Sequence, residues 1–320
     1  MGAIIGWFMG LPFSIIGNDK MKQILKDPLE RERARFLSVC SDFVDEFVRQ
    51  SPQGGGRPKF PPNDLLKALL IQSLHGVSFH RIQSDLHLAK MLGFINSVPK
   101  KSTLSKYMND PSLTDKLERL IQTCAFSFMN SEDTLIVDST WFATKMYTGG
   151  SKIVHDKANA PLDKVRKVHI GFLPNSKIIA YAKATIGTTH DCPLFKDIVS
   201  TVVNNGFNID KLLADAGYLS KANYALCESL GIKGVFINFK SNITGKHPKS
   251  KAWRNSFNLY KNEPEVWHEN YRYRVLIEAL YSAIKKKFLP WLRTKTDTAR
   301  DNESLLKMLA YNLTILGRYY

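Results

Sequence analysis

The stretch DTLIVDSTWFATK (residues 133–145) is rich in β-branched and aromatic residues, the composition of a buried β-strand. Two further segments of this kind follow it, RKVHIGFL (166–173) and KIIAYAKATIG (177–187). The tripeptide PNS between them is typical of a tight turn. Together the three segments predict an antiparallel meander of three strands.

Helices and strands alternate after the meander. In chain order we expect a helix at 191–203, a short buried strand at 211–219, a helix at 220–231, a strand at 234–240 and a last helix that begins near 271. This order is that of the ribonuclease H-like arrangement. The fold class is therefore predicted as α/β, a ribonuclease H-like domain with a mixed five-stranded sheet and helices over residues 131–320.

The chain before this domain is predicted to be all-helical. A linker rich in Pro and Gly, SPQGGGRPKFPP (51–62), separates its first two helices. Apolar residues recur at helical spacing or in buried runs, and we expect helices at 29–50, 63–76, 78–86, 102–110 and 112–130. Residues 21–130 therefore form an all-α domain in this interpretation.

The segment 78–110 fits a helix-turn-helix. Lys100, Lys101 and Lys106 would then lie at the start of a recognition helix. A plain helical bundle that serves packing or dimerisation fits this segment equally well, so both interpretations stay open.

The first 20 residues are apolar and differ from common targeting segments. No positively charged region precedes the apolar run MGAIIGWFMGLPFSIIG, as a signal peptide would require. The run is also short for a membrane span. We expect a non-native leader upstream of a start at Met21, with a membrane anchor as the less favoured alternative.

Positive charge dominates the composition. The formal net charge is +16 and the pI is about 9.6, which favours a polyanionic partner such as nucleic acid. Residues 240–300 hold 14 Lys and Arg against 5 Asp and Glu, a local balance of 14 − 5 = +9. The four cysteines form no CxxC pair, which argues against a zinc site or a disulfide framework and indicates a reducing, cytoplasmic compartment.

Two aspartates interrupt apolar strands. Asp138 follows Leu-Ile-Val in the first predicted strand, and Asp215 follows Leu-Leu-Ala in the fourth. A buried carboxylate needs a partner, and a single one would be satisfied equally well by a buried Arg or by backbone amides. Because the first and fourth strands are neighbours in the predicted sheet, the two side chains are expected to lie at one edge.

A third carboxylate lies on the last predicted helix, in YRYRVLIEALYSAIKKK (271–287). Tyr271, Arg274, Glu278 and Lys285 are spaced by 3, 4 and 7 residues, which places them within about 60° on one helix face. Ordinary solvated charges would also explain this row. Three converging carboxylates repel one another unless a cation lies between them. Hard ions such as Mg²⁺ or Mn²⁺ suit these oxygens, and two ions about 4 Å apart support phosphoryl transfer.

The chain resembles DDE-type insertion-sequence transposases that carry a Y-x2-R-x3-E-x6-K signature. The residues 271–285 match that signature at every spacing, while DST (138–140) and ADAGY (214–218) resemble the motifs of the first and second aspartate. The resemblance covers roughly residues 59–315 and points to the compact subgroup that lacks a β-rich insertion. It implies a catalytic, metal-binding triad of Asp138, Asp215 and Glu278, and DNA contacts through Tyr271, Arg274 and Lys285.

The activity that the resemblance implies is DNA transposition. Such an enzyme binds terminal inverted repeats, cleaves DNA with two Mg²⁺ or Mn²⁺ ions and joins the 3′-hydroxyl to target DNA as a homodimer, here in a prokaryotic-type nucleoid. One alternative is a domesticated nuclease or DNA-binding regulator. A ribonuclease H-like RNA-processing enzyme is the other.

Further candidates lie outside the triad. His190 and Asp191 resemble a family feature near the metals, although Asp191 is better explained as the N-cap of the next helix. His169 is expected to be a satisfied core histidine. Basic and aromatic residues interleave in the predicted loop 241–269, which suits contacts with a DNA strand end through Lys246, Lys249, Lys251, Trp253 and Arg254. A basic solvated loop with Trp253 in the core is the less favoured alternative.

Overall fold

The computed structural model describes residues 28–48, 60–144, 165–240, 243 and 250–319. The described chain divides into two compact units. One contains the N-terminal residues up to Leu120 together with residues from Thr296 onward, and the other contains Ile121–Lys295. The predicted apolar leader lies outside the described residues. None of the helices in these ranges is both long and apolar enough to cross a membrane.

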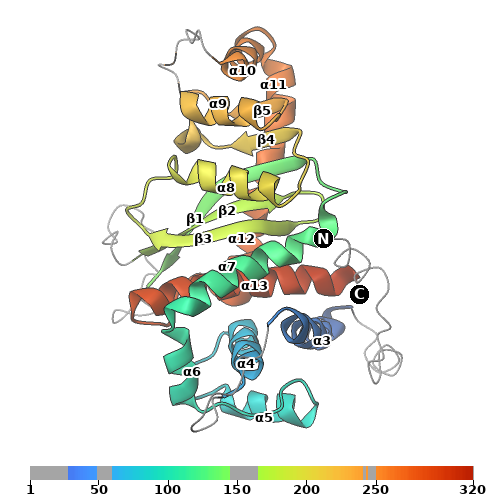
Figure 1. Ribbon diagram of the computed structural model, residues 1–320, viewed down its shortest axis with the longest axis vertical. Helices are drawn as coiled ribbons and strands as arrows, with labels where there is room; N and C mark the ends of the chain where they lie inside the picture. Colours follow the sequence, from blue (N-terminus) through green and yellow to red (C-terminus); the bar gives the residue numbers. More distant parts are fainter. Residues whose placement is uncertain (1–27, 49–59, 145–164, 241–242, 244–249, 320) are drawn as a thin grey trace. The chain divides into compact units, whose positions relative to one another are not determined.

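The first unit is helical, as predicted (Figure 1). Its central feature is α13 (Asp297–Tyr319), which is buried along nearly its whole length and packs against α3, α4 and α6. The helices that precede it in the chain are α3 (Pro28–Phe47), α4 (Pro62–His75), α5 (Gln83–Met91), α6 (Lys101–Met108) and α7 (Pro111–Ala125), whose last turn belongs to the second unit.

The C-terminal helix belongs to a different unit from the one expected. The sequence interpretation assigned all residues from 131 to 320 to the second domain, but α13 is grouped with the N-terminal helices. Buried polar side chains account for part of this association. The amide of Asn302 donates to the carbonyls of Met108 and Asp110, and Asn302 also accepts from Thr114 at 2.7 Å.

The helices of segment 78–110 are not joined by a short turn. Residues 92–100 connect α5 to α6, whereas a helix-turn-helix uses a turn of about 3–4 residues. The backbone amides of Asn96 and Ser97 in this connection donate to the carboxylate of Asp64 on α4. The longer connection is therefore fixed onto α4, which agrees better with a plain bundle.

The second unit contains the predicted sheet. Its strands are β1 (Thr134–Ala143), β2 (Val165–Leu173), β3 (Ile178–Ile186), β4 (Lys211–Ala214) and β5 (Gly234–Ile237), in the order β3-β2-β1-β4-β5. The first three strands pair antiparallel, and β4 and β5 are parallel to β1. This is the mixed sheet of a ribonuclease H-like domain, so the predicted fold class is confirmed.

The fourth strand is shorter than predicted. It ends at Ala214, and residues Ala216–Tyr218 form a 3-10 turn instead of continuing the strand. The side chain of Asp215 accepts a hydrogen bond from the amide of Gly217, which stabilises the turn at the strand end. β4 therefore ends one residue before Asp215.

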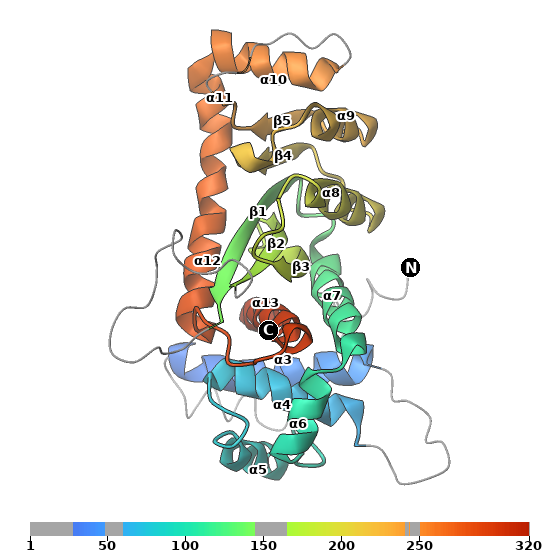
Figure 2. The same cartoon turned by 90° about the vertical axis from the view of Figure 1, so that its left-hand side faces the viewer.

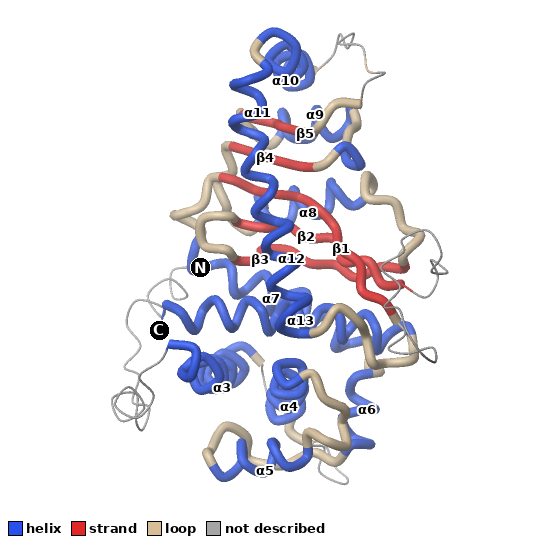
Figure 3. The backbone as a smooth tube through the Cα atoms, turned by 180° about the vertical axis from the view of Figure 1, so that it is seen from behind, coloured by secondary structure: helices blue, strands red, loops and turns tan. Residues whose placement is uncertain are grey.

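Helices cover both faces of the sheet (Figures 2 and 3). On one face lie α8 (Leu194–Asn204) and α9 (Lys221–Ser229), and on the other lie α11 (Pro264–Tyr271) and α12 (Val275–Phe288). A 3-10 turn at Arg272–Arg274 connects α11 to α12. The last predicted helix, which was expected to begin near residue 271, is therefore divided. Tyr271 ends α11, Arg272–Arg274 form the 3-10 turn, and α12 begins at Val275.

The segment that was predicted as a loop at 241–269 contains a helix. Residues Lys251–Asn262 form α10, which packs against α9, β5 and α11. Trp253, Phe257 and Tyr260 recur at helical spacing and all contact the ring of Phe239, at centroid distances of 5.3–5.4 Å. The spacing of these aromatic residues is the pattern of a helix. It was overlooked in the sequence because many charged residues surround them.

Candidate active site

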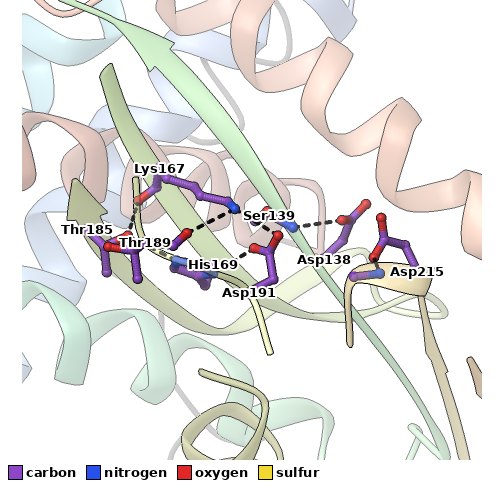
Figure 4. A network of polar contacts seen from close by, with 9 residues as sticks. Asp138, Ser139, Lys167, His169, Thr185, Thr189, Asp191 and Asp215 are labelled. Carbon is purple, nitrogen blue, oxygen red and sulfur yellow. Dashed lines mark hydrogen bonds and ion pairs between the residues drawn. The ribbon is translucent and has the colours of Figure 1, made fainter. Parts of the chain in front are cut away.

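Asp138 and Asp215 lie side by side on neighbouring strands. β1 and β4 are parallel, and Val137 pairs with Ala214, so the two aspartates occupy the next positions along this register. Figure 4 shows the two carboxylates beside each other, Asp138 on β1 and Asp215 at the turn that follows β4. The geometry expected from the first and fourth strands is thus present.

Backbone amides hold both carboxylates in place. The amide of Ser139 donates to Oδ1 of Asp138 at 2.8 Å, and that of Gly217 donates to Oδ1 of Asp215 at 2.6 Å. A Cβ atom at Gly217 would lie 2.8 Å from this same Oδ1, which is closer than such contacts occur. Position 217 therefore needs glycine for the backbone to approach the carboxylate.

Arg274 links Asp138 to Glu278. Its guanidinium donates to Oδ2 of Asp138 at 2.9 Å and to Oε1 of Glu278 at 3.0 Å. The Asp138 side chain is 11% exposed and that of Glu278 is 59% exposed, so the inner half of this bridge is shielded from water. One arginine thus connects the helical carboxylate to the strand carboxylate.

The ionisation of Asp138 is strongly perturbed. Burial raises its pKa, and the neighbouring Asp215 and Asp191 add to this effect. Arg274 and the Ser139 amide act in the opposite direction, and the resulting pKa is about 6. A carboxyl group with this pKa at a sheet edge is typical of a functional site.

Tyr271 and Lys285, the other two residues of the helical row, each contact an aromatic ring. The ring of Tyr271, at the end of α11, stacks on Trp267 with a centroid distance of 4.6 Å. Burial raises the pKa of Tyr271 to about 12. The ammonium of Lys285 lies 6.0 Å from the centre of the Phe142 ring on β1. Both residues therefore flank the carboxylates, Tyr271 before Arg274 and Lys285 beyond Glu278 on α12.

Asp191 belongs to a buried ion network on the other face of β1. Its carboxylate is 2.8 Å from the Lys167 ammonium and 3.3 Å from Nδ1 of His169, which also contacts Thr185 (Figure 4). Burial raises the pKa of Asp191, but hydrogen bonds to His169 and Lys167 outweigh it and hold this pKa below its ordinary range.

The predicted N-cap role of Asp191 is wrong. Pro193 occupies the N-cap of α8, and the Asp191 side chain is directed to Lys167 instead. His169 is fully buried and partnered, as expected of a core histidine. His190 is exposed. Lys167 was missed, although polar side chains at alternate positions 167 and 169 of an apolar strand were visible in the sequence.

The predicted DNA contacts of segment 241–269 are only partly accessible. Trp253 is 2% exposed, so the predicted stacking of this ring on a base is wrong, because Tyr224 and Phe239 already cover it. Lys251 and Arg254 are exposed on α10. Lys246 and Lys249 lie outside the described residues. In the first unit, exposed positions on or next to α6 are occupied by Lys100, Lys101 and Lys106.

The carboxylates do not form a ready-made cage for a metal ion. Within the described ranges, no three His, Cys, Asp or Glu side chains are grouped so that they could hold one. The guanidinium of Arg274 lies between Asp138 and Glu278 and supplies the positive charge there. The donor oxygens nevertheless fit a hard divalent ion, because Asp138 and Asp215 are adjacent and Glu278 is within reach of the same arginine.

Comparisons with known proteins agree with this arrangement. The family model "Transposase DDE domain" matches residues 130–313, which include all three carboxylates, and a second model, "Transposase domain", matches residues 22–110. The search of curated proteins gave no significant match.

Two solved structures show weak similarity to the chain. One is a piggyBac transposase synaptic complex with hairpin DNA, at 12% identity and a TM-score of 0.47, covering 92% of this chain and 75% of that one. The other is a Mos1 transposase paired-end complex with the left transposon end, at 12% identity and a TM-score of 0.24, covering 100% and 97%. Because both TM-scores are below 0.5, the assignment rests on the family models. They show that the chain belongs to the DDE transposases, DNA-cleaving and DNA-transferring enzymes that depend on divalent metal ions.

Proposed function

We propose that this protein is the transposase of an insertion sequence, of the compact subgroup with the Y-x2-R-x3-E-x6-K signature. It binds the terminal inverted repeats of its element, cleaves the DNA and joins the free 3′-hydroxyl to target DNA. The observation that carries this proposal is that Asp138 and Asp215 directly follow the paired residues Val137 and Ala214 of β1 and β4, and that Arg274 bridges Asp138 to Glu278. The compact form is supported by the described residues between β5 and α12, which form α10 and α11 but no strand.

Asp138, Asp215 and Glu278 are the proposed metal ligands. Two Mg²⁺ or Mn²⁺ ions, when bound, activate a water or 3′-hydroxyl and stabilise the leaving oxygen. The amides of Ser139 and Gly217 fix one oxygen of each aspartate and thereby orient the other. Glu278 is the most exposed of the three and can turn inward once Arg274 releases it.

Arg274 is proposed to exchange a carboxylate for a DNA phosphate. An arginine fork binds either group with two hydrogen bonds, and metal ions remove its electrostatic role at the carboxylates. Lys285 and Tyr271 flank it and are proposed to contact the same strand. Lys246, Lys249, Lys251 and Arg254 extend this basic surface.

The N-terminal unit is proposed to bind DNA and to hold two protein copies together. Transposition needs two element ends at once, which a homodimer would provide. The exposed lysines at 100, 101 and 106 support a role in DNA binding, and the net charge of +16 supports DNA as the partner. Such an enzyme acts on the nucleoid in a prokaryotic-type cytoplasm.

The affinity of this site for a divalent metal ion should depend on pH near pH 6, which is unusually high for an aspartate. An aspartate must lose its proton to bind an ion, and the pKa of Asp138 is about 6 instead of the usual 3.8. We expect the affinity for Mn²⁺ to fall by about fivefold between pH 6 and pH 5, measured by calorimetric titration. An ordinary aspartate would leave it nearly constant there, so a flat affinity from pH 5 to pH 7 would contradict this role of Asp138.

A cleavage and joining assay tests the proposed function. A labelled duplex with the element's end is incubated with the protein, unlabelled target DNA and Mg²⁺, alongside a Glu278→Gln variant. Gln keeps the shape of Glu but not the charge that a metal ion needs. We expect end-specific cleavage and joined products with the wild type, and end binding without either product with the variant.

Two results would contradict the proposal. Specific binding without cleavage by the wild type would favour the regulator alternative. Equal cleavage by the wild type and the variant would show that Glu278 is not part of the catalytic site.

A further inference from the structure

Tyr281 lies in the same row of α12 as the proposed catalytic residues. It follows Glu278 by three positions and precedes Lys285 by four, so the three side chains share one helix face. That face is anchored to β1 at two points. Arg274 contacts Asp138 at one end, and Lys285 lies over Phe142 at the other. Tyr281 is between these anchors and therefore faces β1.

The corresponding face of β1 begins with the catalytic aspartate. Asp138 and Phe142 are an even number of residues apart and point to the same face, with the buried Thr140 between them. The Tyr281 hydroxyl is close enough to Asp138 and Arg274 to interact with their charges.

The hydroxyl of Tyr281 is buried and makes no hydrogen bond with any residue that the structure describes. Leaving such a group without a partner costs about 1–3 kcal/mol, so buried hydroxyls nearly always have one. Two other buried tyrosines of this unit can be compared. Tyr224 contacts Ser256 and the carbonyl of Ile237, whereas the hydroxyl of Tyr218 also makes no hydrogen bond with a described residue. The cost at Tyr281 therefore requires an explanation.

The charges around this hydroxyl indicate what kind of partner it can take. Burial raises the pKa of Tyr281 well above its ordinary value, and the neighbouring Asp138 raises it further. The phenol thus keeps its proton at any pH at which the protein would act, and it is a hydrogen-bond donor beside a site of oxygen ligands. A Mg²⁺ or Mn²⁺ ion is bound by carboxylate oxygens, and such an oxygen has a further lone pair that can accept a hydrogen bond from a phenol.

We propose that Tyr281 is a positioning residue whose hydroxyl donates a hydrogen bond to an oxygen in the ligand shell of the metal ion at Asp138. This inference rests on the proposed function, because it assumes that Asp138 binds a metal ion. The Tyr281 hydroxyl then gains its missing hydrogen-bond acceptor when the metal ion binds. Its hydrogen bond would orient a metal ligand, as residues outside the ligand set do in other metal sites.

Two measurements on the Tyr281→Phe variant, compared with the wild type, test this inference: its affinity for Mn²⁺ and its thermal stability. Mn²⁺ is titrated into the full-length protein without DNA at pH 7.5, and the Tm of the metal-free protein is measured in EDTA. We expect Kd for Mn²⁺ to rise by about tenfold, because an outer hydrogen bond is lost. The metal-free Tm should be unchanged or higher, because an unsatisfied buried hydroxyl is removed.

Tyr224→Phe is the matched control. The hydroxyl of this tyrosine is also buried but is satisfied, and its ring lies in the aromatic cluster beside Trp253. Its substitution should lower the Tm and leave Kd for Mn²⁺ unchanged. The two variants are therefore expected to show opposite patterns.

Three results of these measurements without DNA would overturn the inference. They are a Kd of Tyr281→Phe equal to that of the wild type, a fall in its Tm like that of Tyr224→Phe, and a wild type that binds no Mn²⁺. In the first case, an intact requirement for Mg²⁺ and Glu278 in DNA cleavage would show that the proposed function holds without Tyr281. A defect of Tyr281→Phe that occurs only with DNA would assign the hydroxyl to a phosphate and would also overturn it.

Discussion

Asp138→Asn should lower the rate of DNA cleavage by at least about a thousandfold and, at the same time, stabilise the metal-free protein at pH 8. The loss of cleavage is expected because Asn cannot supply the negative charge that metal binding at this edge requires. Single-turnover cleavage of the labelled element end measures the first effect. Chemical denaturation in EDTA measures the second.

The stabilisation follows from the direction of the pKa shift. The pKa of Asp138 is raised from 3.8 to about 6, so the folded protein binds this proton more tightly than the unfolded chain does. The ionised carboxylate therefore destabilises the fold, fully above pH 6 and not at all below pH 4. A difference of about two pKa units corresponds to about 3 kcal/mol, and this difference already includes the opposing effect of Arg274. We therefore expect a gain of at most about 3 kcal/mol at pH 8 that disappears at pH 4.

Asp210→Asn is the control for this experiment. Asp210 lies just before β4 and pairs with Lys233 on the surface, where the side chains are 43% and 77% exposed. Its substitution should change neither cleavage nor stability by a measurable amount. A fall in the stability of Asp138→Asn at pH 8 would show that Asp138 is a structural residue whose charge supports the fold.

Asp191→Ala should destabilise the protein by about 3–5 kcal/mol. The substitution leaves the ammonium of Lys167 without its carboxylate, and that side chain is only 7% exposed. A remaining contact with the carbonyl of Thr189, at 3.3 Å, does not neutralise the charge. Urea denaturation at pH 7 measures the loss. Replacing both partners, with Lys167→Met and Asp191→Leu, should recover much of it because no buried charge is then left.

A second ion pair in the same unit provides the comparison. Lys183 and Asp197 are 3.7 Å apart and 39% and 54% exposed. Asp197→Ala should cost less than about 1 kcal/mol, since water and salt screen an exposed pair. Equal losses from Asp191→Ala and Asp197→Ala would contradict a role for burial in the Lys167 network.

The sequence was sufficient for the sheet because its signals are local. The five strands were found from short apolar runs, and two of them were set too long. The fourth was predicted past Ala214, since ADAGY continues an apolar pattern that the Asp215 turn interrupts, and the fifth was predicted to residue 240 although β5 ends at Ile237. The helix α10 was missed because its aromatic residues are surrounded by charges. The partner of α13 could not be predicted, because nothing local shows that Asn302 contacts Met108 and Asp110.

The adjacency of the three carboxylates was predictable in part. Parallel neighbours in the expected topology place Asp138 beside Asp215, and this needed only the strand order. The bridge formed by Arg274 was not foreseen, because helical spacing gives the face of a side chain but not the group that it contacts across the sheet. The burial of individual side chains could not be predicted either. Trp253 is buried and Lys251 is exposed, although they lie only two positions apart in the sequence.

The position of α13 reverses the usual order in which the parts of a chain fold during synthesis. The catalytic unit is one continuous segment, Ile121–Lys295, and has all its residues before α13 is made. The N-terminal unit emerges from the ribosome first but must wait for the residues after Thr296 to fill its core. Until then its helices expose apolar surface, a state in which nascent chains aggregate or recruit chaperones. A frameshift or stop codon after α12 would therefore spare the carboxylates yet unfold the N-terminal unit.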